Sequence, residues 1–207
     1  MKKIDSGLQY DVYEISRNRV LKIPRPNFAM IRTMLIWWPK YYFRPFKLIK
    51  ELRRYNLLLN DSIRGFKKRK IPRSLTGNSI LNGKVIRQDK LIPLKDLMPD
   101  YGNFKNLFQD YAKLIVELWK YGVQEITFNF AVNYGINKKG KVVLMDLGEL
   151  AFDKEEVAKY LSYKKWERCY SFRHNLNKKQ KIIYSKIMEK NLTLKKLNSI
   201  WGSKLKD

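Results

Sequence analysis

Residues 132–148 read VNYGINKKGKVVLMDLG, which is the most specific pattern in the chain. Two short apolar runs flank Lys138-Lys139-Gly140, which predicts a β-hairpin with a tight turn. Asn133 precedes the first strand and Asp146 follows the second, so the hairpin separates two side chains that carry oxygen atoms. Gly148 would give the backbone freedom to turn after Asp146. An ordinary turn after a strand is the plain alternative.

The N-terminal part of the chain is predicted to be rich in β-structure. Alternating residues over 10–24 indicate a first hairpin. A second hairpin is expected over 79–91 around Asn82-Gly83, the strongest short turn signal in the chain. Between the hairpins, apolar residues at helical spacing predict a helix over 46–59, and the basic residues at 64–70 indicate a solvated turn.

The second half of the chain is predicted to be mostly helical. Pro93 and Pro99 mark a linker, and an apolar stripe at helical spacing runs from Phe104 to Leu118. Asp153 and Glu156 form the capping-box pattern that starts a later helix. We therefore expect an α+β fold of two lobes: a β-rich N-terminal lobe at 1–92 with an aromatic and basic insert at 27–46, and a helical C-terminal lobe at 93–207 with a buried hairpin at 131–146.

The charge of the chain is strongly positive. Its 207 residues include 44 Lys+Arg against 19 Asp+Glu, a formal net charge of +25. Such a field attracts polyanions, among them nucleic acid, an anionic membrane surface and an anionic substrate such as a phosphorylated glycan. A lysine-rich composition without any anionic partner explains the charge equally well. The hydrophobic content of 44% excludes global disorder.

The scarcity of cysteine and histidine excludes several classes of site. Cys169 and His174 are the only residues of their types, so the sequence has no disulfide framework and no Cys/His zinc site. A single thiol fits a reducing cytosol. The longest apolar cluster, at 28–38, is too short for a transmembrane segment and contains Arg32. We expect a cytoplasmic protein without a transmembrane segment or a signal peptide.

The order of these features resembles the protein-kinase-like superfamily, which includes protein kinases, antibiotic phosphotransferases and bacterial lipopolysaccharide kinases. The resemblance covers roughly residues 5–150. Residues 6–12 are similar to a reduced Gly-rich loop, and Val20-Leu21-Lys22-Ile23 is similar to the strand that carries the phosphate-binding lysine. Asn133 and Asp146-Leu147-Gly148 resemble the catalytic-loop Asn and the D-F-G motif.

The resemblance implies a protein-kinase-like two-lobed fold with a reduced helical C-lobe and a site for ATP and Mg²⁺ between the lobes. Lys22 would hold the phosphates, and Val20 lies on the same face of its strand. Glu51, almost the only acid in a strongly basic stretch, would orient Lys22, unless it forms a surface ion pair on its own helix. The implied nucleotide-binding residues are Gly7, Val12, Val20 and Lys22, and the implied Mg²⁺ ligands are Asn133 and Asp146.

The sequence departs from the family at the catalytic base. The family has an Asp five residues before the Asn, and this chain has Phe128 there. Glu125 is the nearest carboxylate and is our candidate base. The A-P-E element is absent and the tail at 163–207 is short, which disfavours a peptide-docking platform.

Residues 28–46 lie between Lys22 and Glu51 in the sequence and combine Trp, Tyr and Phe with Lys and Arg. This composition is typical of a membrane-interface helix, of a surface that stacks on single-stranded nucleic acid, and of an ordinary core. The sequence leaves these three interpretations open.

Two functional hypotheses follow from the sequence. The first is an ATP–Mg²⁺-dependent phosphotransferase that acts on an anionic or glycan acceptor. The second is a pseudokinase, without activity, that binds nucleotide and engages nucleic acid, an anionic membrane surface or another partner. Retention of Lys22, Glu51, Asn133 and Asp146 favours the first hypothesis, and Phe128 favours the second.

Overall fold

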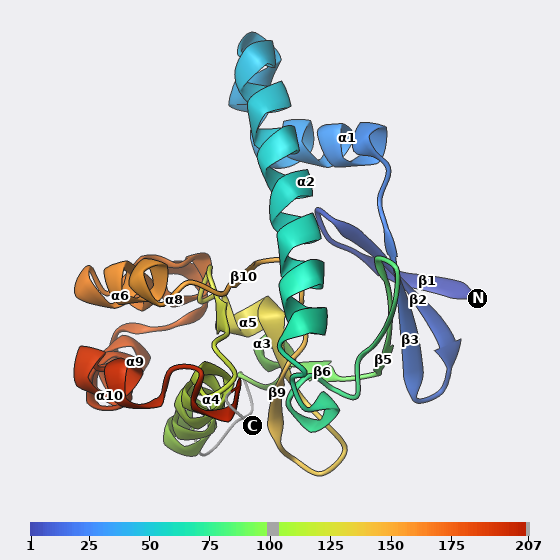
Figure 1. Cartoon of the computed structure of the whole chain (residues 1–207). Coiled ribbons are helices and arrows are strands. Elements are labelled where there is room, and N and C mark those ends of the chain that lie inside the picture. The colour runs from blue at the N-terminus through green and yellow to red at the C-terminus, as the bar shows by residue number, and fades with distance from the viewer. Residues whose placement is uncertain (99–103, 206–207) are drawn as a thin grey trace.

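The computed structural model of the chain describes residues 1–98 and 104–205. It confirms an α+β fold of two lobes, with a sheet in one lobe and mostly helices in the other (Figure 1). The long helix α2 (Pro45–Lys68) runs alongside both lobes. Pro99, the second proline of the expected linker, lies outside the described residues. Pro93 is followed directly by a short helix, α3 (Leu94–Leu97), so this part of the expected linker is helical.

The sheet of the first lobe carries Lys22 at its centre. Its strands are β1 (Lys2–Ser6), β2 (Tyr10–Ser16), β3 (Arg19–Pro24), β4 (Ile80–Asn82) and β5 (Val85–Asp89). They pair antiparallel in the order β1-β2-β3-β5-β4, which confirms both expected hairpins. Lys22 lies opposite Val12 on one side and Ile86 on the other. Val20 and Lys22 are both buried, as the strand alternation predicts.

Helix α2 is longer than the helix expected over 46–59, and the expected basic turn is wrong because residues 64–68 are helical. Phe66 continues the helical spacing and is buried in the main core, while the cations of this segment stay exposed. Gly65 serves close packing, since a side chain there would overlap the ring of Phe152. The basic composition of this segment therefore reflects the outer face of a helix.

The insert between β3 and α2 is helical and has a core of its own. Helix α1 (Asn27–Trp37) and the 3-10 helix η1 (Pro39–Phe43) pack on the first turns of α2. The buried residues of this second core are Met30, Met34, Tyr41, Leu48 and Leu52. The core interpretation is therefore correct for one face of the insert.

The second lobe surrounds a short hairpin with helices. Tyr134 pairs with Leu144 in that hairpin, and Asp153 caps the next helix by accepting the backbone N–H of Glu156 at 2.9 Å, as expected. The remaining elements are η2 (Arg73–Leu75), β6 (Ile92–Pro93), α4 (Phe104–Trp119), β7 (Gln124–Glu125), α5 (Phe130–Asn133), β8 (Tyr134–Ile136), β9 (Val142–Leu144), β10 (Leu150–Ala151), α6 (Lys154–Ser162), α7 (Lys165–Arg168), α8 (Tyr170–Asn175), α9 (Lys178–Asn191), α10 (Leu194–Ile200) and η3 (Ser203–Leu205).

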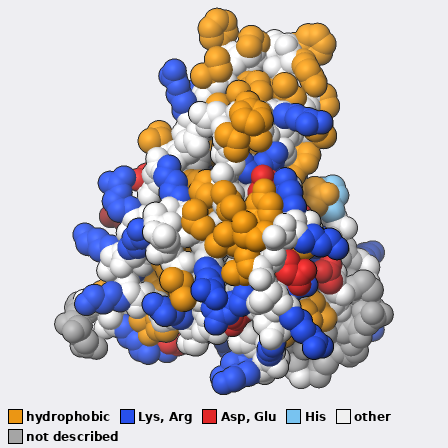
Figure 2. Space-filling view, turned by 90° about the vertical axis from the view of Figure 1, so that its right-hand side faces the viewer, with side chains coloured by type: hydrophobic (Ala, Val, Ile, Leu, Met, Phe, Trp, Pro, Cys, Tyr) orange, Lys and Arg blue, Asp and Glu red, His pale blue; other side chains and the backbone are white. Residues whose placement is uncertain are grey.

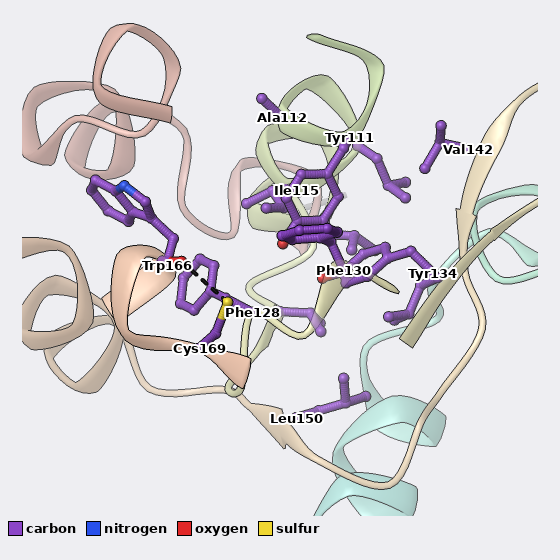
Figure 3. Close-up of a cluster of buried hydrophobic side chains, with 14 of the residues drawn as sticks. Tyr111, Ala112, Ile115, Phe128, Phe130, Tyr134, Val142, Leu150, Trp166 and Cys169 are labelled. Atoms are coloured by element: carbon purple, nitrogen blue, oxygen red, sulfur yellow. Dashed lines mark hydrogen bonds between the residues drawn. The ribbon is translucent and has the colours of Figure 1, made fainter. Parts of the chain in front are cut away.

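The main core is aromatic and lies between α4, α5 and α9. Phe130 packs edge-to-face on Phe108 at 4.9 Å between ring centroids. Tyr111 packs in the same way on Tyr134 at 4.7 Å (Figure 3). This core holds the loop before α5 and the hairpin β8–β9 in place. Across residues 1–98 and 104–205, no helix has both the length and the apolar character needed to cross a bilayer.

Candidate functional site

A cleft of about 850 Å³ lies between the sheet and the second lobe. Its lining comes from the β1–β2 loop, β3, β5, α2, the loop before α5, α5 itself and the segment after β9. Of the eight residues that the sequence singles out, six line this cleft: Gly7, Val12, Val20, Lys22, Asn133 and Asp146. Glu51 and Glu125 are not part of the lining.

Lys22 reaches across the cleft from the sheet to the second lobe. Its Nζ donates a hydrogen bond of 2.6 Å to the carbonyl oxygen of Met145, the residue before Asp146. The side chain is only 7% exposed, and burial lowers the pKa of Lys22 while the nearby carboxylate of Asp146 opposes that effect. The amine of Lys22 is thus held close to Asp146 and has little contact with solvent.

Asn133 and Asp146 meet at the base of the β8–β9 hairpin. The carbonyl oxygen of Asn133 accepts the backbone N–H groups of Met145 and Asp146, at 2.8 and 3.1 Å. Asp146 Oδ1 accepts the backbone N–H of Gly148 at 2.9 Å, which fixes the carboxylate in a tight turn. The two residues that the sequence separates by a hairpin are therefore neighbours in space.

Glu125 lies behind the cleft wall and fixes the amide of Asn133. Asn133 Nδ2 donates to Glu125 Oε1 at 3.1 Å and to Thr127 Oγ1 at 2.9 Å, and the Thr127 hydroxyl itself donates to Glu125 Oε1. Burial raises the pKa of Glu125 to about 7, against the lowering effect of these hydrogen bonds. Glu125 is 0% exposed, so the structure gives it a positioning role and no direct access to the cleft.

The orientation of Asn133 suits a metal ligand. Both partners of its amide nitrogen are acceptors, so the nitrogen points inward and Oδ1 points to the opposite side of the amide group. Asn133 and Asp146 both line the cleft. The backbone N–H of Gly148 binds Oδ1 of Asp146, and the other carboxylate oxygen, Oδ2, takes no part in this hydrogen bond. Two hard oxygen donors on adjacent backbone segments fit Mg²⁺ with its preference for oxygen ligands.

Glu51 does not pair with Lys22 in the structure. Its carboxylate forms an ion pair of 2.8 Å with Arg54 on the same helix, which was the plain alternative from the sequence. Tyr55, one turn further along α2, lines the cleft instead. Because a helix rises about 1.5 Å per residue, Glu51 lies about 6 Å from Tyr55 along the helix axis, toward the start of α2.

The loop that contains Gly7 folds down onto the second lobe. Gln9 Nε2 donates to the carbonyl oxygen of Tyr55 at 3.1 Å, and Gln9 Oε1 fills the space that a side chain at Gly148 would need. Arg25 holds the loop from the other side, because its Nη1 donates to the carbonyl oxygen of Gly7 at 2.6 Å. A Cβ at Gly7 would make only ordinary contacts, so backbone freedom is not what this position requires.

Phe128 stands where the resemblance places an acidic base, and its side chain points into the core. It is fully buried against Trp166, at 6.2 Å between ring centroids, and does not line the cleft (Figure 3). Its φ of +53° lies in the left-handed region that bulky residues rarely adopt. The neighbours Thr127 and Asn129 are the residues of this loop that face the cleft.

Glu149 is a cleft residue that the sequence reasoning missed. It follows Gly148 directly and lines the cleft. Burial, together with the negative charges of Asp146 and Glu125, raises the pKa of Glu149 to about 8. An acid next to the Asp-Leu-Gly turn, in a chain with few acids, is the signal that could have identified it.

No protein-family model and no curated protein sequence matches the chain. A solved structure of the Mycobacterium tuberculosis protein Rv3197 in complex with erythromycin matches with 15% sequence identity and a TM-score of 0.44. The match covers 91% of this chain and 53% of that one, so the chain spans about half the length of that protein.

Proposed function

We propose that the chain is a kinase-like phosphotransferase that binds ATP and Mg²⁺ in the cleft between its lobes. The observation that supports this most directly is the meeting of Lys22, Asn133 and Asp146 at one cleft, from segments more than a hundred residues apart. One buried cation beside two oxygen donors is the arrangement that phosphate and a divalent ion need together.

Each residue has a role in this proposal. Lys22 attracts the phosphates, and their negative charge would favour its protonated form against the effect of burial. Val12 and Val20 line the cleft on the sheet side and offer an apolar surface to the adenine ring of ATP. Asn133 and Asp146 would hold Mg²⁺, which when bound neutralises charge on the phosphates.

The proton of the acceptor hydroxyl needs a base, and Glu149 is the carboxylate that we assign to this role. It lines the cleft, whereas Glu125 lies behind the wall and Phe128 points into the core. With a pKa of about 8, Glu149 releases its proton near the pH at which a general base is most useful. The basic surface of the chain favours an anionic acceptor.

A second candidate function is nucleotide binding without transfer. Two observations favour it: the base position of the family holds the buried Phe128, and Gln9 occupies space above Gly148. A binding module of this kind would keep the roles of Lys22 and Asp146 and lose that of Glu149.

Phosphate release from ATP with and without Mg²⁺ tests the proposal. We expect slow Mg²⁺-dependent release that increases with pH up to about 8, as Glu149 loses its proton. Glu149→Gln should reduce the rate roughly a hundredfold and remove this pH dependence, whereas Asp110→Asn, on the exposed face of α4, should leave both unchanged. Binding of ATP without release would establish the second candidate, and the absence of binding would overturn both.

A further inference from the structure

The end of the molecule that α1, η1 and the start of α2 form carries large apolar side chains in solvent. Phe43 and Phe46 are each 89% exposed. Hydrophobic side chains gather over this projecting end in the space-filling view (Figure 2). We call this surface the aromatic tip; its exposed apolar residues are Phe28, Ile36, Trp37, Tyr42, Phe43, Phe46 and Ile49.

The aromatic tip is supported by a packed core. The second core lies directly beneath it and buries Met34 and Tyr41. Trp38 packs edge-to-face on Trp37 at 5.8 Å and on Tyr41 at 6.1 Å between ring centroids. The apolar side chains on its outside are therefore presented by a packed scaffold, in contrast to the usual case in which large apolar side chains are covered.

Every charged residue within residues 27–50, which form the aromatic tip, is basic. No Asp or Glu occurs between Glu14 and Glu51 in the sequence. The exposed cations of residues 27–50 are Arg32, Lys40, Arg44, Lys47 and Lys50. An apolar surface with cations and no acids is complementary to a surface that is apolar inside and anionic outside.

We infer that the aromatic tip docks onto an anionic lipid membrane, with its rings among the headgroups and its cations on the lipid phosphates. Aromatic rings flanked by Lys and Arg are the side chains that favour this interface. The tip projects from the body of the molecule, which fits insertion into a bilayer surface, whereas single-stranded nucleic acid is usually bound in a groove (Figure 1). Trp37 belongs to both the tip and the cleft lining, so docking brings the cleft entrance close to the headgroups.

Binding to vesicles tests this inference. The full chain is mixed with vesicles of phosphatidylcholine alone, or of phosphatidylcholine with phosphatidylglycerol, and the bound fraction is measured by sedimentation. We expect strong binding to the anionic vesicles, weak binding to the neutral ones, and a blue shift of tryptophan fluorescence from Trp37. Phe43→Ser with Phe46→Ser should weaken binding at least about tenfold, because two exposed rings no longer enter the interface.

Matched variants distinguish binding through the aromatic tip from binding through any exposed apolar side chain and from an effect of net charge. Ile182→Ser with Leu194→Ser removes two exposed apolar side chains of the second lobe and should leave binding unchanged. Lys47→Glu with Lys50→Glu should weaken binding more than tenfold, whereas Lys178→Glu with Lys179→Glu, the same change of charge on α9, should weaken it far less. These substitutions are all at exposed positions, and circular dichroism checks that each variant is folded.

Three results would overturn the inference. One is that the wild-type chain does not bind anionic vesicles. The second is that the variants on α9 and α10 weaken binding as much as those at the tip. The third is that the tip variants leave vesicle binding intact while they abolish salt-sensitive binding to single-stranded RNA or self-association of the chain, which would assign the tip to a nucleic acid or to a second copy.

Discussion

Phenylalanine occupies two opposite environments in this molecule. Beside the cleft, Phe128 and Phe130 are 0% exposed, and at the aromatic tip Phe43 and Phe46 are 89% exposed. Both regions are rich in aromatic residues, and both lie in a strongly basic chain. What differs is the partner: α4, α8 and α9 cover the loop before α5, whereas the described residues offer no second layer over the tip. Composition alone therefore does not decide which aromatic residues form a core and which form a surface.

The largest expected effect contrasts these two environments directly. Phe130→Ala removes a ring packed on Phe108 and Tyr184, and we expect it to lower the free energy of unfolding by about 3–5 kcal/mol. Phe46→Ala at the tip should change it by less than about 0.5 kcal/mol. Urea denaturation of both variants measures the difference. Equal losses would show that the tip is covered in solution.

A second contrast is electrostatic, because buried acids occur beside the cleft and no acid occurs in the tip sequence. The pKa of Glu125 is raised from 4.5 to about 7, so the folded state keeps a proton that the unfolded state has already lost. Stability from this group is complete below pH 4.5 and is lost as the pH rises through about 7, by about 3 kcal/mol.

Glu125→Gln tests this pH dependence. Denaturation midpoints between pH 4.5 and 7 should fall with increasing pH in the wild type and should fall less steeply in this variant, in which Glu149 is the remaining acid with a raised pKa. Glu155→Gln, on the exposed face of α6, is the matched control and should keep the wild-type slope. A wild-type slope of the opposite sign would contradict the buried position of Glu125.

A smaller effect tests how Gln9, in the β1–β2 loop, packs over Gly148 beside the cleft. Gly148→Ala would displace Gln9 and break its hydrogen bond with Tyr55, which should cost about 1–2 kcal/mol. Adding Gln9→Ala removes the clash, so the double variant should be no less stable than Gln9→Ala alone. Additive losses in a thermal-unfolding cycle would show that Gln9 does not rest on Gly148.

The sequence identified those parts of the site that depend on local patterns. The alternation in β3 placed Val20 and Lys22 on one face, and the hairpin signal related Asn133 to Asp146. The predicted pair of Lys22 and Glu51 is not formed, because it depends on which turn of α2 faces Lys22 on β3, and helical periodicity does not specify that turn.

Other features could not be predicted because they depend on long-range packing. Glu149 shares the cleft lining with Tyr55 of α2 and with Thr127, which are distant from it in the sequence. The insert divides into a core face and an exposed face because its buried side chains meet α2, while nothing in the described structure covers the others. The helix at residues 64–68 was not predicted, because most residues of this segment are basic and Phe66 is its one large apolar residue.

The central claim is that Asp146 helps to hold Mg²⁺ and nucleotide in the cleft, and thermal unfolding with ATP tests it most directly. At a ligand concentration about a hundred times the Kd, binding should stabilise the wild type by about 2.7 kcal/mol, only when Mg²⁺ is present. Asp110→Ala, which removes an exposed acid on α4, should keep this stabilisation, and Asp146→Ala should lose it. The absence of a Mg²⁺-dependent increase in Tm for the wild type, or an equal increase for Asp146→Ala, would contradict the claim.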